Sequence, residues 1–143
     1  MTDLAFLPAH ELARRLRRRE VSALDLLDHH LARLPEDHAN ARAFAERLQA
    51  GAPVQLDLTT VQTNIVVFHL PAGLPMDAPA LSARARERGV LVNAFGPRTV
   101  RAVTHLDVSR AHCVQAAEVL VALLAWIGVP LLLAGRRFIR SES

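Results

Sequence analysis

The sequence predicts a mixed α/β domain of the α+β kind, in which a small antiparallel sheet packs on helices. Short runs rich in β-branched residues, at 63–70 and 99–105, alternate with segments of helical periodicity, and Gly and Pro separate them. Hydrophobic content of 51% with only 4% aromatic residues indicates an aliphatic core. At 143 residues the chain is long enough for one such core and short for two.

A helical segment precedes the predicted sheet. Leu12 and Leu16 form an i, i+4 apolar pair within an arginine-rich stretch. Ser22 followed by Asp25 resembles the capping box that begins a helix. The arginine cluster at 14–19 has no interleaved aromatic residues to stack on bases, so we expect a solvated helix face and no nucleic acid as partner. Leucines at helical spacing predict an apolar face on the second helix: Leu24, Leu27, Leu31 and Leu34.

Cap and turn residues divide the rest of the chain. Pro35 and the acids that follow suit the first turn of a helix that ends near Gly51. The other expected elements follow in order: a strand at 63–70, a helix from Asp77 to Arg88 with Gly89 as its left-handed C-cap, short strands at 90–92 and 99–105, and a last helix from Ser109.

The strand at 99–105 is the most informative stretch, and we expect it to deliver Arg101 and Thr104 to one side of the sheet. The planar fork of an arginine matches a carboxylate or a phosphate, so an arginine fixed on a strand is a candidate anion anchor. A solvent-facing arginine is the alternative that spacing alone favours. We expect His105 and Asp107 to lock the following corner by hydrogen bonds, because no nucleophile elbow accompanies them.

Three separated motifs follow one another in the second half of the chain: VQTNIVVF at 61–68, RGVLVNAFGPRT at 88–99 and RAVTHLDVSR at 101–110. Two more precede them: LDHH at 27–30 and PEDHANAR at 35–42. In chain order the motifs resemble the C-terminal small domain of the low-specificity L-threonine aldolases, which are fold-type I enzymes that use pyridoxal phosphate (PLP), and the first two resemble the helix that enters that domain. The resemblance covers roughly residues 26–120 and implies the small-domain fold of that enzyme class.

The resemblance also implies roles for two residues. Arg101 stands where the family's arginine binds the substrate carboxylate, and Arg98 is a candidate second anion contact. The implied reaction is the cleavage of β-hydroxy amino acids to glycine and an aldehyde. The Schiff-base lysine, the histidines, the aspartate and the phosphate loop of the family belong to its large domain.

The sequence contains no lysine, because all 17 residues counted as Lys or Arg are arginines. PLP enzymes hold their cofactor as a Schiff base to a lysine amine. We therefore expect a truncated or detached small domain that binds no PLP alone and is inactive alone. The expected partners are a large-domain chain or a homo-oligomer, and activity requires the chain that carries the large domain. Whether the chain is an enzyme in its own right stays open.

We divide the chain into a helical extension at 1–25, an aldolase-like domain at 26–120, and an apolar helix with a basic tail at 121–143. The extension weakly resembles the opening helices of amidase-signature enzymes, but it lacks their Gly/Ser-rich stretch and lysine, so an amidase-related module is the least favoured hypothesis. Residues 119–134 form an uncharged apolar run that is shorter than the roughly 20 residues of a bilayer span. An apolar run of this kind can still pack against a partner or associate with a membrane. The main alternative is a small interaction or membrane-associated protein that uses this helix.

Charge and composition indicate which ligands and which cell compartment to expect. The net charge of +3 is too small to indicate nucleic-acid binding. The single cysteine, Cys113, and a start that does not resemble a signal peptide favour the cytoplasm. Among the seven histidines, His29 and His30 are adjacent and point to different helix faces, so we expect no metal site.

Overall fold

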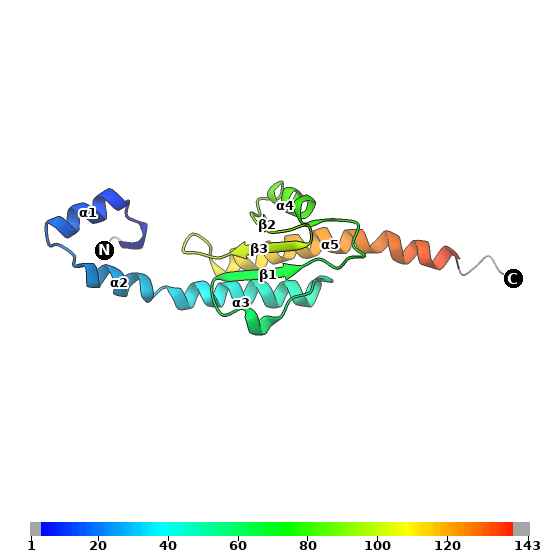
Figure 1. The fold of residues 1–143 in the computed structure, drawn as a ribbon, viewed down its shortest axis with the longest axis horizontal. Helices are drawn as coiled ribbons and strands as arrows, with labels where there is room; N and C mark the ends of the chain where they lie inside the picture. Colours follow the sequence, from blue (N-terminus) through cyan, green and yellow to red (C-terminus); the bar gives the residue numbers. More distant parts are fainter. Residues whose placement is uncertain (1–3, 139–143) are drawn as a thin grey trace.

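The computed structural model describes residues 4–138, with side chains described for residues 4–125. The elements lie along one long axis, with the sheet near the middle (Figure 1). In chain order they are η1 (Leu4–Phe6), α1 (Ala9–Arg17), α2 (Ala23–Leu31), α3 (Leu34–Gly51), η2 (Leu58–Thr60), β1 (Ile65–His69), α4 (Ala78–Arg86), β2 (Asn93–Ala94), β3 (Thr99–Val103) and α5 (Arg110–Phe138).

The sheet has three antiparallel strands in the order β1-β3-β2, so the predicted fold class is confirmed. In this order β3 is the central strand. Val67 of β1 and Asn93 of β2 both lie opposite Arg101. Hydrogen bonds on both sides therefore hold the backbone of the strand that carries the predicted anchor.

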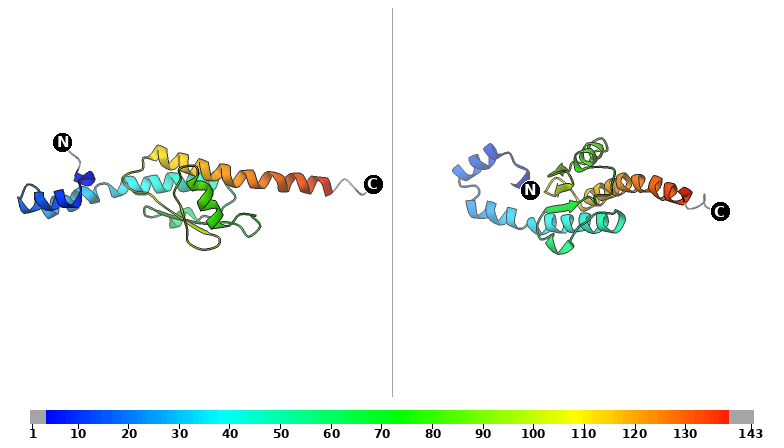
Figure 2. Two further views of the ribbon diagram at one scale, coloured as in Figure 1. Left: turned by 90° about the horizontal axis from the view of Figure 1, so that it is seen from above. Right: turned by 45° about the vertical axis from the view of Figure 1, so that its right-hand side comes forward.

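The core lies between one face of the sheet and the helices. Strands alternate their side chains, and Val66, Phe68 and Val100 are fully buried on the inner face. Helices α3 and α5 lie side by side along the sheet (Figure 2), and α4 packs against α5 and the edge strand β2. Burying one large aliphatic or aromatic side chain contributes about 1.5–3 kcal/mol, so this face stabilises the fold. The helical side of the core contains Ala41, Phe44, Ala45, Leu48, Leu81, Ala117, Leu120 and Leu124.

The capping residues predicted from the sequence lie at the ends of helices in the structure. Ser22 and Asp25 form both hydrogen bonds of the predicted capping box. The Asp77 carboxylate accepts a hydrogen bond from the backbone N–H of Ala80 at 2.8 Å and caps α4. Gly89 has a φ of +77°, the left-handed conformation predicted for it, although α4 ends at Arg86, two residues earlier than expected.

Two details of the predicted sheet were wrong. The short strand expected at 90–92 lies at Asn93–Ala94, because the segment before it first closes helix α4 through the Val90 N–H and the Ala85 carbonyl. Thr104 does not share a side with Arg101. It is only 5% exposed and donates its hydroxyl to the Asp37 carbonyl at 2.8 Å, because residues three apart along an extended chain point to opposite faces.

The predicted apolar face of the N-terminal helices is present, but no other described element packs over it. Leu24, Leu27, Leu31 and Leu34 are 64, 53, 50 and 42% exposed, and no residue of the described elements η1, α1 and α2 is buried. In Figure 1 this segment lies apart from the sheet at the N-terminal end. Helical periodicity therefore identified the face correctly, but the described fold does not cover it.

Helix α5 contains the apolar run. It spans 29 residues and continues through Pro130. Across residues 4–138, no helix has both the length and the hydropathy needed to cross a membrane, so the membrane alternative gains no support. Helix α2 passes through the proposed boundary at residue 25 and α5 through that at residue 120, and the three-part division stays a proposal.

Candidate functional site

Arg101 lies on the outer face of the sheet, away from the helices. Its neighbours Val100 and Ala102 are buried on the inner face, and strand alternation directs Arg101 and Val103 outward. The same outer face carries Ile65 and Val67 of β1, which are 41% and 39% exposed. Ile65 lies opposite Val103, and Val67 lies opposite Arg101. Arg101 is therefore the one charged residue in a group of four neighbouring outward-facing residues, of which the other three are apolar.

The guanidinium of Arg101 has no hydrogen-bond or ion-pair partner among the described residues. Its Nε is buried without a partner, and its Cζ lies 5.4 Å from the centre of the Phe95 ring. A buried N–H without an acceptor is uncommon, and an arginine offers further donors in a planar fork. The side chain is therefore free to bind an anion that arrives at the open face of the sheet.

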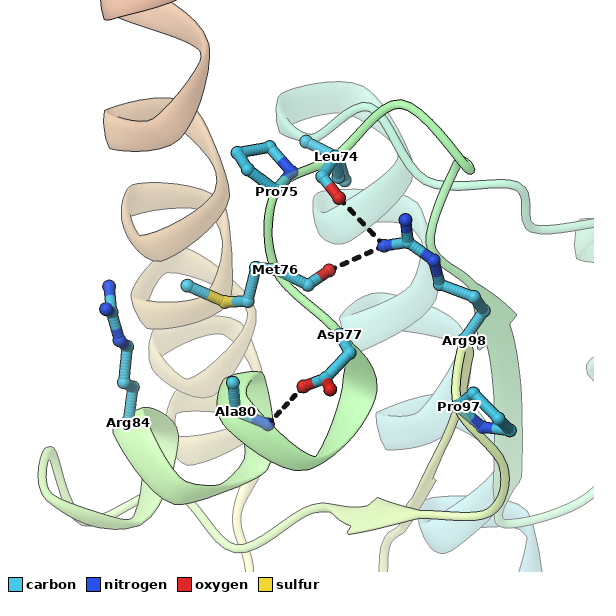
Figure 3. Close-up of a pocket in the computed structure, with 8 residues that line it drawn as sticks. All are labelled: Leu74, Pro75, Met76, Asp77, Ala80, Arg84, Pro97 and Arg98. Carbon is cyan, nitrogen blue, oxygen red and sulfur yellow. Dashed lines mark hydrogen bonds between the residues drawn. The ribbon is translucent and has the colours of Figure 1, made fainter.

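Arg98 is used differently. Its Nη1 donates to the carbonyls of Leu74 at 2.9 Å and Met76 at 2.6 Å, and its Nη2 donates to the carbonyl of Ala72 at 2.5 Å. Figure 3 shows the guanidinium against this loop, at the edge of a hollow of about 540 Å³. Arg84 lies on the opposite side of the hollow from Arg98 (Figure 3). These bonds give Arg98 a role in holding the loop, and its role as an anion contact stays a prediction.

The sequence did not reveal a group of hydrogen bonds, called here the polar lock, that Asn64, Thr104 and Asn40 make between the ends of β1 and β3 and helix α3. The Asn64 side-chain amide donates to the Thr104 carbonyl at 2.7 Å, and the Thr104 N–H donates to the Asn64 carbonyl at 2.9 Å. Asn40, only 3% exposed, donates from α3 to the Val108 carbonyl at 3.2 Å. An asparagine among the alanines of α3 was the available signal for a buried hydrogen bond.

The corner after β3 contains the histidine contacts. The Asp107 N–H donates to His105 Nδ1 at 3.3 Å, which confirms a hydrogen bond between these two residues at the corner, although both side chains are exposed. At the start of α5, His112 takes the place of the usual Glu of a capping box. Its Nδ1 accepts from the Ser109 N–H at 3.4 Å, while the Ser109 hydroxyl accepts from the His112 N–H at 3.3 Å. These residues therefore shape the backbone that leads away from Arg101.

The residues around Arg101 do not fit PLP by themselves. Val67 and Asn93 lie opposite Arg101 on the neighbouring strands and Phe95 contacts its guanidinium, and the 143-residue sequence offers no lysine to hold the cofactor. The described residues also contain no group of three or more His, Cys, Asp or Glu that could hold a metal ion. Burial raises the pKa of the Cys113 thiol, with a smaller contribution from Asp37, so this cysteine is not an activated nucleophile.

Comparison with known proteins supports the resemblance found in the sequence. Low specificity L-threonine aldolase of Escherichia coli K12 is 40% identical over 100 residues, which are 69% of this chain and 27% of that protein. Low-specificity L-threonine aldolase 1 of Arabidopsis thaliana is 26% identical over 88 residues, 62% of this chain and 25% of that protein. The chain thus spans about a quarter of the length of these relatives, and the partial match fits a small domain. No family model matches the chain.

Among solved structures, the α-aminoadipate aminotransferase of Thermus thermophilus, complexed with N-(5'-phosphopyridoxyl)-L-leucine, has a similar fold. The TM-score is 0.51 at 20% identity, over 84% of this chain and 30% of that one. At this identity the likeness concerns the fold alone. About two thirds of this chain is thus similar in sequence to L-threonine aldolases, and its mixed fold is found within a fold-type I PLP enzyme.

Proposed function

We propose that this chain supplies the small-domain part of an aldolase-type site, in which Arg101 binds the carboxylate of an amino-acid substrate. The observation that carries the proposal is the free guanidinium of Arg101 on the outer face of the central strand, within a segment similar to L-threonine aldolase. Two parallel hydrogen bonds from one guanidinium fix both the position and the orientation of a carboxylate. An amino acid held in this way presents its Cα and side chain to groups outside the chain.

The proposed reaction is the cleavage of a β-hydroxy amino acid to glycine and an aldehyde, carried out together with a large-domain partner. The partner, or a second type of chain in an oligomer, would supply the lysine and hold PLP, because the residues around Arg101 cannot do so. In this proposal the chain alone is inactive. A lysine could not replace Arg101, because a compact ammonium does not reproduce the planar fork.

Rescue in trans tests this proposal. The full chain is mixed with a lysine-bearing large domain of the E. coli aldolase, and glycine formation from L-threonine is measured. We expect activity only in the mixture, and a loss of roughly 10- to 150-fold in kcat/KM for Arg101→Lys, equivalent to about 1.5–3 kcal/mol for charge-assisted hydrogen bonds.

The matched control is Arg86→Lys, which makes the same change at an exposed position at the end of α4. We expect this variant to rescue as well as the unaltered chain. Rescue that survives Arg101→Lys would contradict the role assigned to Arg101. A visible PLP absorbance band that stays with the purified chain after gel filtration would contradict the need for a partner.

A further inference from the structure

Phe95 is an exposed aromatic residue with no part in the core. Its side chain is 69% exposed, in the turn between β2 and β3. The only ring contact described for Phe95 within residues 4–125 is with the guanidinium of Arg101, at 5.4 Å from Cζ to the ring centre. An arginine over an aromatic face at this distance makes a cation–π contact. The fold thus places a large apolar side chain in solvent, where it touches the predicted substrate anchor.

The turn that carries Phe95 is held in place on several sides. The Phe95 N–H donates to the Thr99 carbonyl at 2.8 Å, and the Pro97 carbonyl accepts from the Ala78 N–H at 2.9 Å. The Arg98 side chain donates to the carbonyls of Leu74 and Met76 in the loop that precedes α4 (Figure 3), and also to the Ala72 carbonyl of the same loop. Because these contacts fix the backbone next to Phe95, the ring has a stable base from which to pack against Arg101.

Arg101 needs such a contact because nothing else described restrains the end of its side chain. An arginine that is held by no hydrogen bond has many rotamers, and binding an anion would require it to give up most of them. The buried Nε is out of reach of a ligand from solvent, which leaves the two terminal nitrogens to face an incoming carboxylate. A ring packed on the face of the guanidinium leaves this edge open and limits how the group can turn.

We infer that Phe95 is a positioning residue for Arg101, which stacks on the guanidinium and aims its two terminal nitrogens at a carboxylate. This inference rests on the function proposed for Arg101. An aromatic ring is required at position 95, because the contact depends on the π face. Phe95→Tyr therefore keeps the stack, whereas Phe95→Leu keeps an apolar residue of smaller size and loses it. Both changes leave the fold intact, since the side chain is exposed.

The stack itself is tested by NMR of the full-length chain, from the Nε–Hε signal of Arg101, which is assigned by its disappearance in Arg101→Lys. We expect an upfield ring-current shift in the unaltered chain and in Phe95→Tyr, and loss of this shift in Phe95→Leu. Amide spectra of the three proteins serve as the control for folding. An Arg101 signal that is the same in Phe95→Leu as in the unaltered chain would overturn the inference.

The positioning role is tested by titrating the same three proteins with acetate at constant ionic strength, again following Arg101. We expect the acetate affinity to fall roughly two- to fivefold in Phe95→Leu and to stay unchanged in Phe95→Tyr, as for a cation–π contact at an exposed site. Equal affinity in all three proteins would overturn the positioning role. A ring-current shift without any response to acetate would contradict the carboxylate function and leave Phe95 with a purely structural contact.

Discussion

Residues 34–125 and residues 4–33 are built from similar aliphatic side chains, yet they differ in what covers those side chains. In the first region, Phe44, Leu48 and Phe68 are almost completely buried between helices and sheet. In the second, Leu24, Leu27 and Leu31 of α2 repeat at helical spacing and are half exposed or more. Periodicity therefore reveals which face of an element is apolar, whereas the partner of that face depends on the rest of the fold.

The same contrast separates the two faces of the sheet. Val66, Phe68 and Val100 face the helices, while Ile65 and Val103 face outward and remain about 40% exposed beside Arg101. β-branched residues on an uncovered face provide strand propensity without forming a core. We relate both uncovered surfaces to the proposed partner domain, since the chain spans about a quarter of the length of its relatives.

The largest effect is expected from the core of residues 34–125. Phe68 is fully buried, so Phe68→Ala should lower the free energy of unfolding by about 3–5 kcal/mol. The matched change Leu27→Ala, at a side chain that is 53% exposed, should alter it by at most about 0.5 kcal/mol. Urea unfolding followed by circular dichroism measures both. A comparable loss in Leu27→Ala would show that the α2 face is packed in solution.

A smaller effect is expected from the polar lock. Thr104→Val keeps the shape of the buried side chain but removes the hydroxyl that donates to the Asp37 carbonyl, and should lower the free energy of unfolding by about 0.5–1.5 kcal/mol. Thr60→Val is the matched control, because the Thr60 hydroxyl makes a comparable bond to the Asp57 carbonyl at an exposed position. Chemical denaturation of the two variants distinguishes these roles. Equal destabilisation would mean that burial of Thr104 contributes nothing.

The smallest effect is expected at the cap of α2 and should remain local. The hydroxyl of Ser22, and then its backbone N–H, donate to Asp25 and hold the pKa of that carboxyl below its ordinary value of 3.8. Because the folded-state pKa is depressed, the cap stabilises α2 above pH 3.8 and is lost as the pH falls through the lower folded-state value. Backbone chemical shifts of α2 should therefore move toward coil only in strong acid.

Two variants make this acid transition specific. In Asp25→Asn the pH dependence of α2 should disappear, and in Ser22→Ala the helix should lose order at its start already at neutral pH. The chemical shifts of β1 and β3 serve as the internal reference in the same spectra. An α2 transition that persists unchanged in Asp25→Asn would assign it to another group.

The sequence predicted what depends on neighbouring residues and missed what depends on distant ones. Ser22, Asp77 and Gly89 act within one turn of the chain, and all three were predicted correctly. The position of β2 is set by its pairing with β3, so its local sequence gave a strand three residues too early. Burial of Thr104 depends on the Asp37 carbonyl, far away in the chain, and no pattern around Thr104 reveals it.

The site follows the same rule. The outward placement of Arg101 could be predicted because strand alternation is local, whereas its role as an anion anchor stays a prediction. Its contact with Phe95 could not be predicted, because it requires the turn after β2 to bring residue 95 over the guanidinium. Likewise, Arg98 looked like a free cation in the sequence, whereas the fold brings the carbonyls of Leu74 and Met76 within hydrogen-bond distance.

The proposed role of Arg101 as the anchor of a substrate carboxylate is tested by fusing the aldolase large domain to the full chain and measuring kcat/KM for L-threonine. The covalent link removes any dependence on association between two proteins. We expect an active fusion in which Arg101→Lys lowers kcat/KM roughly 10- to 150-fold while Arg86→Lys leaves it unchanged. An active fusion in which Arg101→Lys matches the unaltered protein would contradict the claim.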